Sequence, residues 1–203
     1  MIDDIVDVIH EEVEEDLLRL GGVAETDLAR SVLTTTRRRF SWLFVNLLTA
    51  IFASFVIFMF EATIEEIVAV AILMPIVASM AGNAGTQSLT VAVRALATHD
   101  LTAANATRIV FKELLVGFAN GLLFAVMVTV VGGVWFAMPE LGLVVGIATL
   151  FTMTVGTVAG ILVPLGLKKS GIDPAIASSV FVTTVTDVVG FFSFLGLVAL
   201  LLL

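Results

Sequence analysis

Residues 175–203 read AIASSVFVTTVTDVVGFFSFLGLVALLLL, an apolar run of 29 residues that contains a single charged residue, Asp187. A helix needs about 20 apolar residues to cross a hydrocarbon core of about 30 Å. In lipid, backbone groups must bond within a helix or a closed barrel, and this run lacks the alternation of barrel strands. The run therefore predicts a transmembrane helix that carries a carboxylate near its middle.

Four more stretches of this kind precede it: Phe40–Phe60, Ile67–Val93, Leu114–Met138 and Leu141–Leu167. The chain has 203 residues, of which 59% are hydrophobic and only 14% charged. A soluble domain needs roughly a quarter of its residues charged, so the composition excludes a soluble fold. We expect an all-α polytopic membrane protein with five transmembrane helices, made of an acidic, amphipathic cytoplasmic segment over residues 1–39 and a membrane domain over residues 40–203.

The basic residues predict an orientation. They fall in the N-terminal segment, in the loop after the second stretch and in the loop after the fourth: Arg19, Arg30, Arg37, Arg38, Arg39, Arg94, Arg108, Lys112, Lys168 and Lys169. Positive residues remain cytoplasmic, so the N-terminus is predicted inside and the C-terminus outside, in the plasma (inner) membrane. The opposite loops carry acids alone: Glu61, Glu65, Glu66 and Glu140. These acids either form an outer mouth that attracts cations or only keep the loops hydrated.

Two of the stretches carry a polar face. At about 100° per residue, one face of the last stretch collects five residues: Ser179, Thr183, Thr186, Asp187 and Gly190. A face of the second stretch collects Ser79, Asn83, Thr86, Gln87 and Thr90, with Gly82 and Gly85 beside them. Polar side chains in lipid are costly and mark functional sites, so the two faces indicate a pore or a binding site. The alternatives are tight helix packing at the glycines and a protonated or internally bonded Asp187.

The oxygen donors on these faces are hard ligands, which suit Mg²⁺, Ca²⁺ or Mn²⁺. Cysteine is absent, and His10 and His99 fall outside the predicted spans, which disfavours a zinc or copper cage. The chain has no GxSxG or HExxH motif, no phosphate-binding loop and no basic footprint for nucleic acid. The residues therefore favour a divalent-cation transporter over an enzyme, with no organic cofactor. One Asp187 per chain would hold a dehydrated ion poorly, so we expect a symmetric dimer and a hydrated ion.

Two other functions stay open on the residues alone. The first is a proton- or cation-coupled carrier of a small organic solute that uses Asp187 as its coupling site. It is disfavoured because residues 141–167 offer few side chains that could bind an organic group. The second is a membrane scaffold subunit, in which Asp187 would only support folding.

Several segments resemble the membrane domain of MgtE-type magnesium channels. Residues 75–89 (PIVASMAGNAGTQSL) and 93–97 (VRALA) resemble the second helix of that family, and residues 183–192 (TTVTDVVGFF) resemble its fifth. Residues 42–50 (WLFVNLLTA) and 60–63 (FEAT) fit in the same order. The resemblance covers roughly residues 38–203.

The resemblance implies a homodimer of five-helix subunits with a pore on the two-fold axis, lined by the second and fifth helices. It also implies that Asp187 holds a largely hydrated Mg²⁺, with Thr183 and Asn83 near the path. Bacterial members carry a cytosolic helical domain and CBS domains before the membrane domain, and these bind Mg²⁺ and close the gate. About 39 residues precede the first predicted helix here. We therefore expect a membrane-only homologue, regulated by a separate protein or by the eight acids between Asp3 and Asp16.

Overall fold

The computed structural model describes residues 15, 18–21, 23, 31–102 and 104–203. Within these ranges there is no strand, and the main helices are α2 (Val32–Phe58), α3 (Glu61–Glu66), α4 (Ala69–Ala97), α5 (Ala106–Trp135), α6 (Pro139–Lys169) and α7 (Pro174–Leu201). All except α3 are long and apolar enough to cross a membrane. The prediction of an all-α protein with five such helices is confirmed. The helix predicted over residues 1–20 lies mostly outside the described residues.

Two of the spanning helices begin earlier than predicted. α2 starts at Val32 and α5 at Ala106, each eight residues before the apolar stretch assigned to it. Charged residues end an apolar stretch without ending a helix, because long basic side chains can place their charges at the membrane surface. The expected division at residue 39 therefore falls inside a continuous helix, and Glu113 lies within α5.

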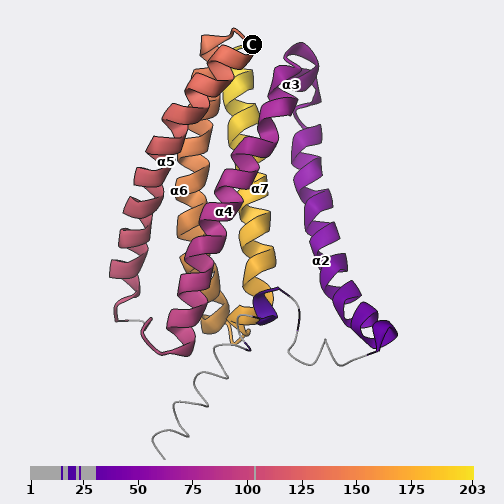
Figure 1. Cartoon of the computed structure of the whole chain (residues 1–203), viewed down its shortest axis with the longest axis vertical. Coiled ribbons are helices and arrows are strands. Elements are labelled where there is room, and N and C mark those ends of the chain that lie inside the picture. Colours follow the sequence, from indigo (N-terminus) through magenta and orange to yellow (C-terminus); the bar gives the residue numbers. More distant parts are fainter. Residues whose placement is uncertain (1–14, 16–17, 22, 24–30, 103) are drawn as a thin grey trace, which may run out of the picture.

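Helix α6 lies at the centre of the bundle, where it packs against α4, α5 and α7 (Figure 1). In its most apolar stretch 61% of the residues are buried, against 11% in α2. Helix α2 stands at the edge of the bundle and packs against α7 (Figure 1). The arrangement leaves α4 and α7 side by side, with α5 on the other side of α6.

Small residues bring the backbones of α4 and α6 into contact. A methyl group added to Gly156 of α6 would lie 2.5 Å from the Ala81 carbonyl oxygen. A methyl group added to Gly160 would overlap the Gly85 carbonyl oxygen. Approaches this close leave no room for a side chain, so they fix the position of α4 on α6.

Charge is divided between the two ends of the bundle. Successive spanning helices run in opposite directions (Figure 1), which collects their basic residues at one end, the basic end: Arg37, Arg39, Arg94, Arg108, Lys112, Lys168 and Lys169. Helix α3 and the start of α6 lie at the other end, the acidic end, and carry Glu61, Glu65, Glu66 and Glu140. The described spans therefore show the separation of charge that the sequence predicts.

Candidate functional site

Asp187 lies on α7, 13 residues after the helix begins at Pro174. At 1.5 Å per residue this is about 20 Å along the helix, well inside a membrane core of about 30 Å. Its side chain is half-buried and forms no hydrogen bond or ion pair with the described residues. A carboxylate at this depth needs water, a cation or a proton to offset the loss of its hydration.

Three glycine contacts show the register in which α7 packs against α4. A methyl group added to Gly85 would lie 2.8 Å from Val182 Cγ1, and methyl groups added to Gly82 and Gly190 would lie 3.8 Å from Thr186 Oγ1 and 3.7 Å from Ala78 Cα. The two helices are antiparallel, so this register places Asp187 at the depth of the Ser79–Asn83 turn of α4. The two predicted polar faces therefore meet at the same level of the bundle.

Exposed polar residues flank this contact on both helices. Asn83, Thr86 and Thr90 on α4 are exposed, as is Thr183 on α7. The hydroxyl groups of Thr86, Thr90 and Thr183 each donate to a carbonyl oxygen of their own helix, at 2.8, 2.9 and 2.9 Å. Their remaining lone pairs can only accept hydrogen bonds. We call Asn83, Thr86, Thr90, Thr183 and Asp187 the α4–α7 face, which offers acceptor oxygens and one carboxylate.

Four residues expected on a common lining lie in helix contacts instead. Gly85 and Gly190 are buried, Gly82 is half-buried, and Thr186 is only 1% exposed. Helix α6 covers this side, since a methyl group on Gly156 would lie 3.2 Å from the Thr186 Cγ2 atom. Within the single chain these residues support the packing of α4 on α6 and α7. Helical periodicity groups residues by face but does not say which neighbouring helix covers that face.

Ser179, near the basic end of α7, contacts the N-terminal segment. Its Oγ atom donates to the Leu20 carbonyl oxygen at 2.9 Å. One residue earlier, Arg19 forms an ion pair with Asp173 at 3.1 Å. Asp173 is the N-cap of α7, where its carboxylate also accepts from the Ala175 N–H group. The described end of the N-terminal segment therefore lies against the start of α7.

The four outer glutamates lie at the acidic end, away from Asp187. Glu61, Glu65 and Glu66 belong to α3, and Glu140 lies in the first turn of α6. All four are exposed and form no ion pair with the described residues. This end of the bundle therefore carries an uncompensated negative charge.

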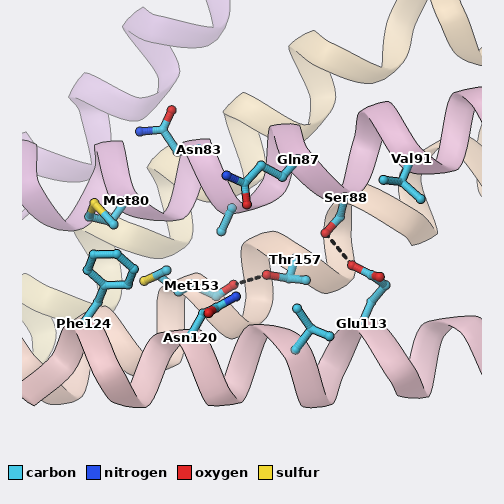
Figure 2. A pocket seen from close by; sticks show the side chains of 12 residues that line it. Met80, Asn83, Gln87, Ser88, Val91, Glu113, Asn120, Phe124, Met153 and Thr157 are labelled. Carbon is cyan, nitrogen blue, oxygen red and sulfur yellow. Dashed lines mark hydrogen bonds between the residues drawn. The ribbon is translucent and has the colours of Figure 1, made fainter.

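Sequence reasoning missed Glu113. It is half-buried on α5 and accepts a hydrogen bond from Ser88 Oγ of α4 at 2.7 Å (Figure 2). The predicted span began one residue later, which left Asp187 as the only charge in a predicted span. Glu113 and Asn120 are seven residues apart, so they share one side of α5, and that spacing could have revealed them.

The side chains that could bind a metal ion include few carboxylates. No three His, Cys, Asp or Glu side chains converge anywhere in the described ranges. Asp187 and Glu113 each stand as a single carboxylate among hydroxyl and amide groups. A dehydrated divalent ion takes six to eight oxygen ligands, whereas a hydrated ion needs only acceptors for its water. Both carboxylates therefore suit a hydrated cation.

Comparison with known families agrees with this chemistry. Residues 74–197 match the family model MgtE, described as a divalent cation transporter. The match runs from α4 into α7 and includes Asp187, Glu113 and the exposed polar residues of α4.

Three proteins similar to the chain are each named magnesium transporter MgtE. The one from Enterococcus faecalis is 37% identical over 186 residues, which cover 92% of this chain and 41% of the relative. The one from Thermus thermophilus is 35% identical over 205 residues, covering 99% and 45%. The one from Bacillus subtilis is 31% identical over 197 residues, covering 97% and 44%. The chain spans less than half the length of these relatives. Because the family model matches more than half of the chain, the chain belongs to the MgtE family of divalent cation transporters.

Proposed function

We propose that two copies of this chain conduct divalent cations, Mg²⁺ first, across the plasma membrane along a path between their α4–α7 faces. One observation carries the proposal. Asp187 lies at membrane depth without a partner in its own chain, next to exposed hydroxyl and amide groups. Membership of a family of divalent cation transporters supports the class of cargo.

A second copy supplies what a single chain lacks. Polar groups that face lipid without a partner are costly, and the α4–α7 face of one chain is exposed. In an isologous dimer the same face of each chain lies opposite itself across a two-fold axis. The polar face then borders a hydrated path instead of lipid, and two Asp187 carboxylates attract each ion.

The cargo keeps most of its water. The hydroxyl groups of the α4–α7 face present acceptors, which match the outward-pointing hydrogens of water around a cation. The face contains no Lys or Arg, which disfavours anions. The positive-inside rule places the basic end in the cytoplasm. The outer glutamates would then raise the local concentration of cations at the entrance.

The direct test is flux of Mg²⁺ into proteoliposomes that contain the purified chain. Asp187→Asn keeps the shape of the side chain and removes its charge, so we expect flux to fall at least about tenfold, the equivalent of about 1.4 kcal/mol. Asp100→Asn is the matched control, because it neutralises an exposed carboxylate in the loop between α4 and α5. Equal flux in the two variants would contradict the proposal. Competition by Ca²⁺, Mn²⁺ and Co²⁺ in the same assay ranks the ions.

We also propose that the N-terminal segment slows entry when internal Mg²⁺ is high. The contacts of Leu20 with Ser179 and of Arg19 with Asp173 support this, because they lie at the basic end of α7. The proposed Mg²⁺ ligands are the eight acids between Asp3 and Asp16. Carboxylates without a fixed cage bind Mg²⁺ weakly, on the millimolar scale of low-affinity oxygen-ligand sites. Deleting residues 1–20 should preserve flux and remove its dependence on internal Mg²⁺. A truncated chain with the full response would exclude a sensor in this segment.

A further inference from the structure

A groove opens beside α4 on the side that faces α5. The two helices both pack on α6 but meet each other at few points, and the space between them is a cavity of about 420 Å³ (Figure 2). Gln87 and Ser88 of α4 and Glu113 and Asn120 of α5 contribute polar groups to its lining. Asn83, which belongs to the α4–α7 face, also lines the cavity at its edge (Figure 2), so the groove borders that face along α4.

The hydrogen bonds in the groove are incomplete. Glu113 Oε2 accepts from Ser88 Oγ at 2.7 Å, and this bond is the one side-chain hydrogen bond between α4 and α5 in the described part of the chain. The other oxygen of Glu113 has no hydrogen-bond partner among the described residues. The Gln87 and Asn120 amides line the cavity and also lack a side-chain hydrogen bond within the described ranges.

Asn120 lies well within the apolar length of α5, and Glu113 lies nearer its basic end. Glu113 is seven residues after the start of α5 and Asn120 is 14, which places them about 10 and 21 Å along the helix. Lipid chains cannot satisfy an amide or a carboxylate, and leaving such groups unbonded costs several kcal/mol. The groove is therefore suited to water or a hydrated ligand between α4 and α5.

The lining selects a cation by charge and by size. It contains one carboxylate and no Lys, Arg or His, so an anion would meet only repulsion. Six waters of about 30 Å³ each fill about 180 Å³, which the cavity of about 420 Å³ can contain. Carboxylate, amide and hydroxyl oxygens accept hydrogen bonds from such waters, whereas they are too few to replace them.

We propose that the groove between α4 and α5 is a second cation site, in which Glu113, Gln87 and Asn120 hold a hydrated divalent cation through its water. The site is lined by residues of one chain and does not depend on the role of Asp187. An ion bound there joins α4 to α5 beyond the single Ser88–Glu113 bond. It therefore stabilises the position of the helix that carries Thr86 and Thr90 of the α4–α7 face.

Binding of Mn²⁺ to the full chain in phosphatidylcholine nanodiscs tests the site, with free hydrated Mn²⁺ measured by electron paramagnetic resonance. The Asp187→Asn chain removes the carboxylate of the proposed path and should retain the groove site. Adding Glu113→Gln to it should reduce bound Mn²⁺ by one ion per chain. Because flux is measured separately, intact flux in Asp187→Asn would reject the transport proposal without touching this one.

Asn120→Asp provides a test that keeps the Glu113–Ser88 bond. A second carboxylate in the groove should tighten Mn²⁺ binding by about tenfold or more, since ligand charge sets the affinity of oxygen sites. Unchanged Mn²⁺ binding in both Glu113→Gln and Asn120→Asp would overturn the proposal. So would an effect of Glu113→Gln on retained phosphatidylethanolamine alone, because the groove would then take a lipid ammonium group. Gel filtration of each variant establishes that the chain remains folded.

Discussion

Two polar regions border α4, the α4–α7 face and the groove beside α5, and they differ in which groups can satisfy their polar side chains. On the α4–α7 face, Asp187 has no partner among the described residues, and the face is open to whatever lies outside the chain. In the groove, Glu113 already accepts from Ser88 and lies between two helices of the same chain. Under the two proposals, the face needs a second copy to become a path, whereas the groove forms a site within each chain.

This difference makes the two carboxylates separable by experiment. A change on the α4–α7 face should alter flux, because the proposed ion path runs along it. A change in the groove should alter binding and the stability of α4 on α5. Helix α4 connects the two regions, so changes to its contact with α6 should affect both.

The largest effect is expected from a positive charge on the face. Thr183→Lys places an ammonium group one turn from Asp187. At about 6 Å and an effective dielectric constant of about 20, its repulsion of a divalent ion is about 5 kcal/mol, enough to abolish measurable flux. Ser170→Lys is the control, because it adds the same charge beside Lys168 and Lys169 outside the predicted spans. Equal Mg²⁺ flux in the two variants would mean that ions do not pass along this face.

A smaller effect on both regions should follow from Gly160→Ala. Its methyl group would overlap the Gly85 carbonyl oxygen and approach the Leu89 nitrogen to 2.9 Å. Forcing α4 away from α6 should reduce stability by about 1–3 kcal/mol and should lower both Mg²⁺ flux and Mn²⁺ binding.

The control for this change lies on the same helix. Gly166→Ala meets no atom within 4 Å and should leave the unfolding midpoint in sodium dodecyl sulfate unchanged. If Gly160→Ala is as stable as Gly166→Ala, the backbone contact does not fix α4.

The bond across the groove should contribute less. Ser88→Ala removes the link to Glu113, and hydrogen bonds between membrane helices contribute about 0.6 kcal/mol on average. Thr154→Val is the comparison, since the Thr154 hydroxyl donates to Leu150 within α6. The unfolding midpoint in sodium dodecyl sulfate should be lower for Ser88→Ala than for Thr154→Val. The opposite order would show that the Ser88–Glu113 bond does not join the helices.

The smallest effect is expected at the acidic end. Replacing Glu61, Glu65 and Glu66 with Gln should lower Mg²⁺ flux by no more than about threefold at low salt, because these exposed acids only raise the local ion concentration. At about 0.1 M salt the Debye length is about 10 Å, so the effect should nearly vanish. A loss that persists at high salt would place the acids in direct contact with the ion.

Most of the fold could be predicted from hydropathy, and the errors have a common cause. The five spans are where the apolar stretches predict them, but α2 and α5 each begin eight residues earlier. An apolar stretch ends at the first charged residue, whereas the helices continue through Arg37 and through Lys112. That difference explains why Glu113 was missed.

The sequence predicts which residues share a face of a helix, but it does not predict which neighbouring helix covers that face. Periodicity grouped Thr183 with Asp187, and both lie beside the contact of α7 with α4. It also grouped Thr186 with them, although α6 covers that residue. Coverage by a neighbour depends on close approaches such as Gly156 to Ala81, and one helix read alone does not reveal them.

The central claim is that ions pass between the α4–α7 faces of two copies, and cysteine cross-linking tests it most directly. The chain has no cysteine, so Thr183→Cys introduces a single thiol on the face. Val134→Cys, 77% exposed on α5, is the control. In membranes treated with a short bismaleimide, the account predicts a covalent Thr183→Cys dimer with blocked Mg²⁺ flux and no dimer for Val134→Cys. A Thr183→Cys chain that stays monomeric, or a cross-linked dimer that conducts Mg²⁺ at the original rate, would contradict it.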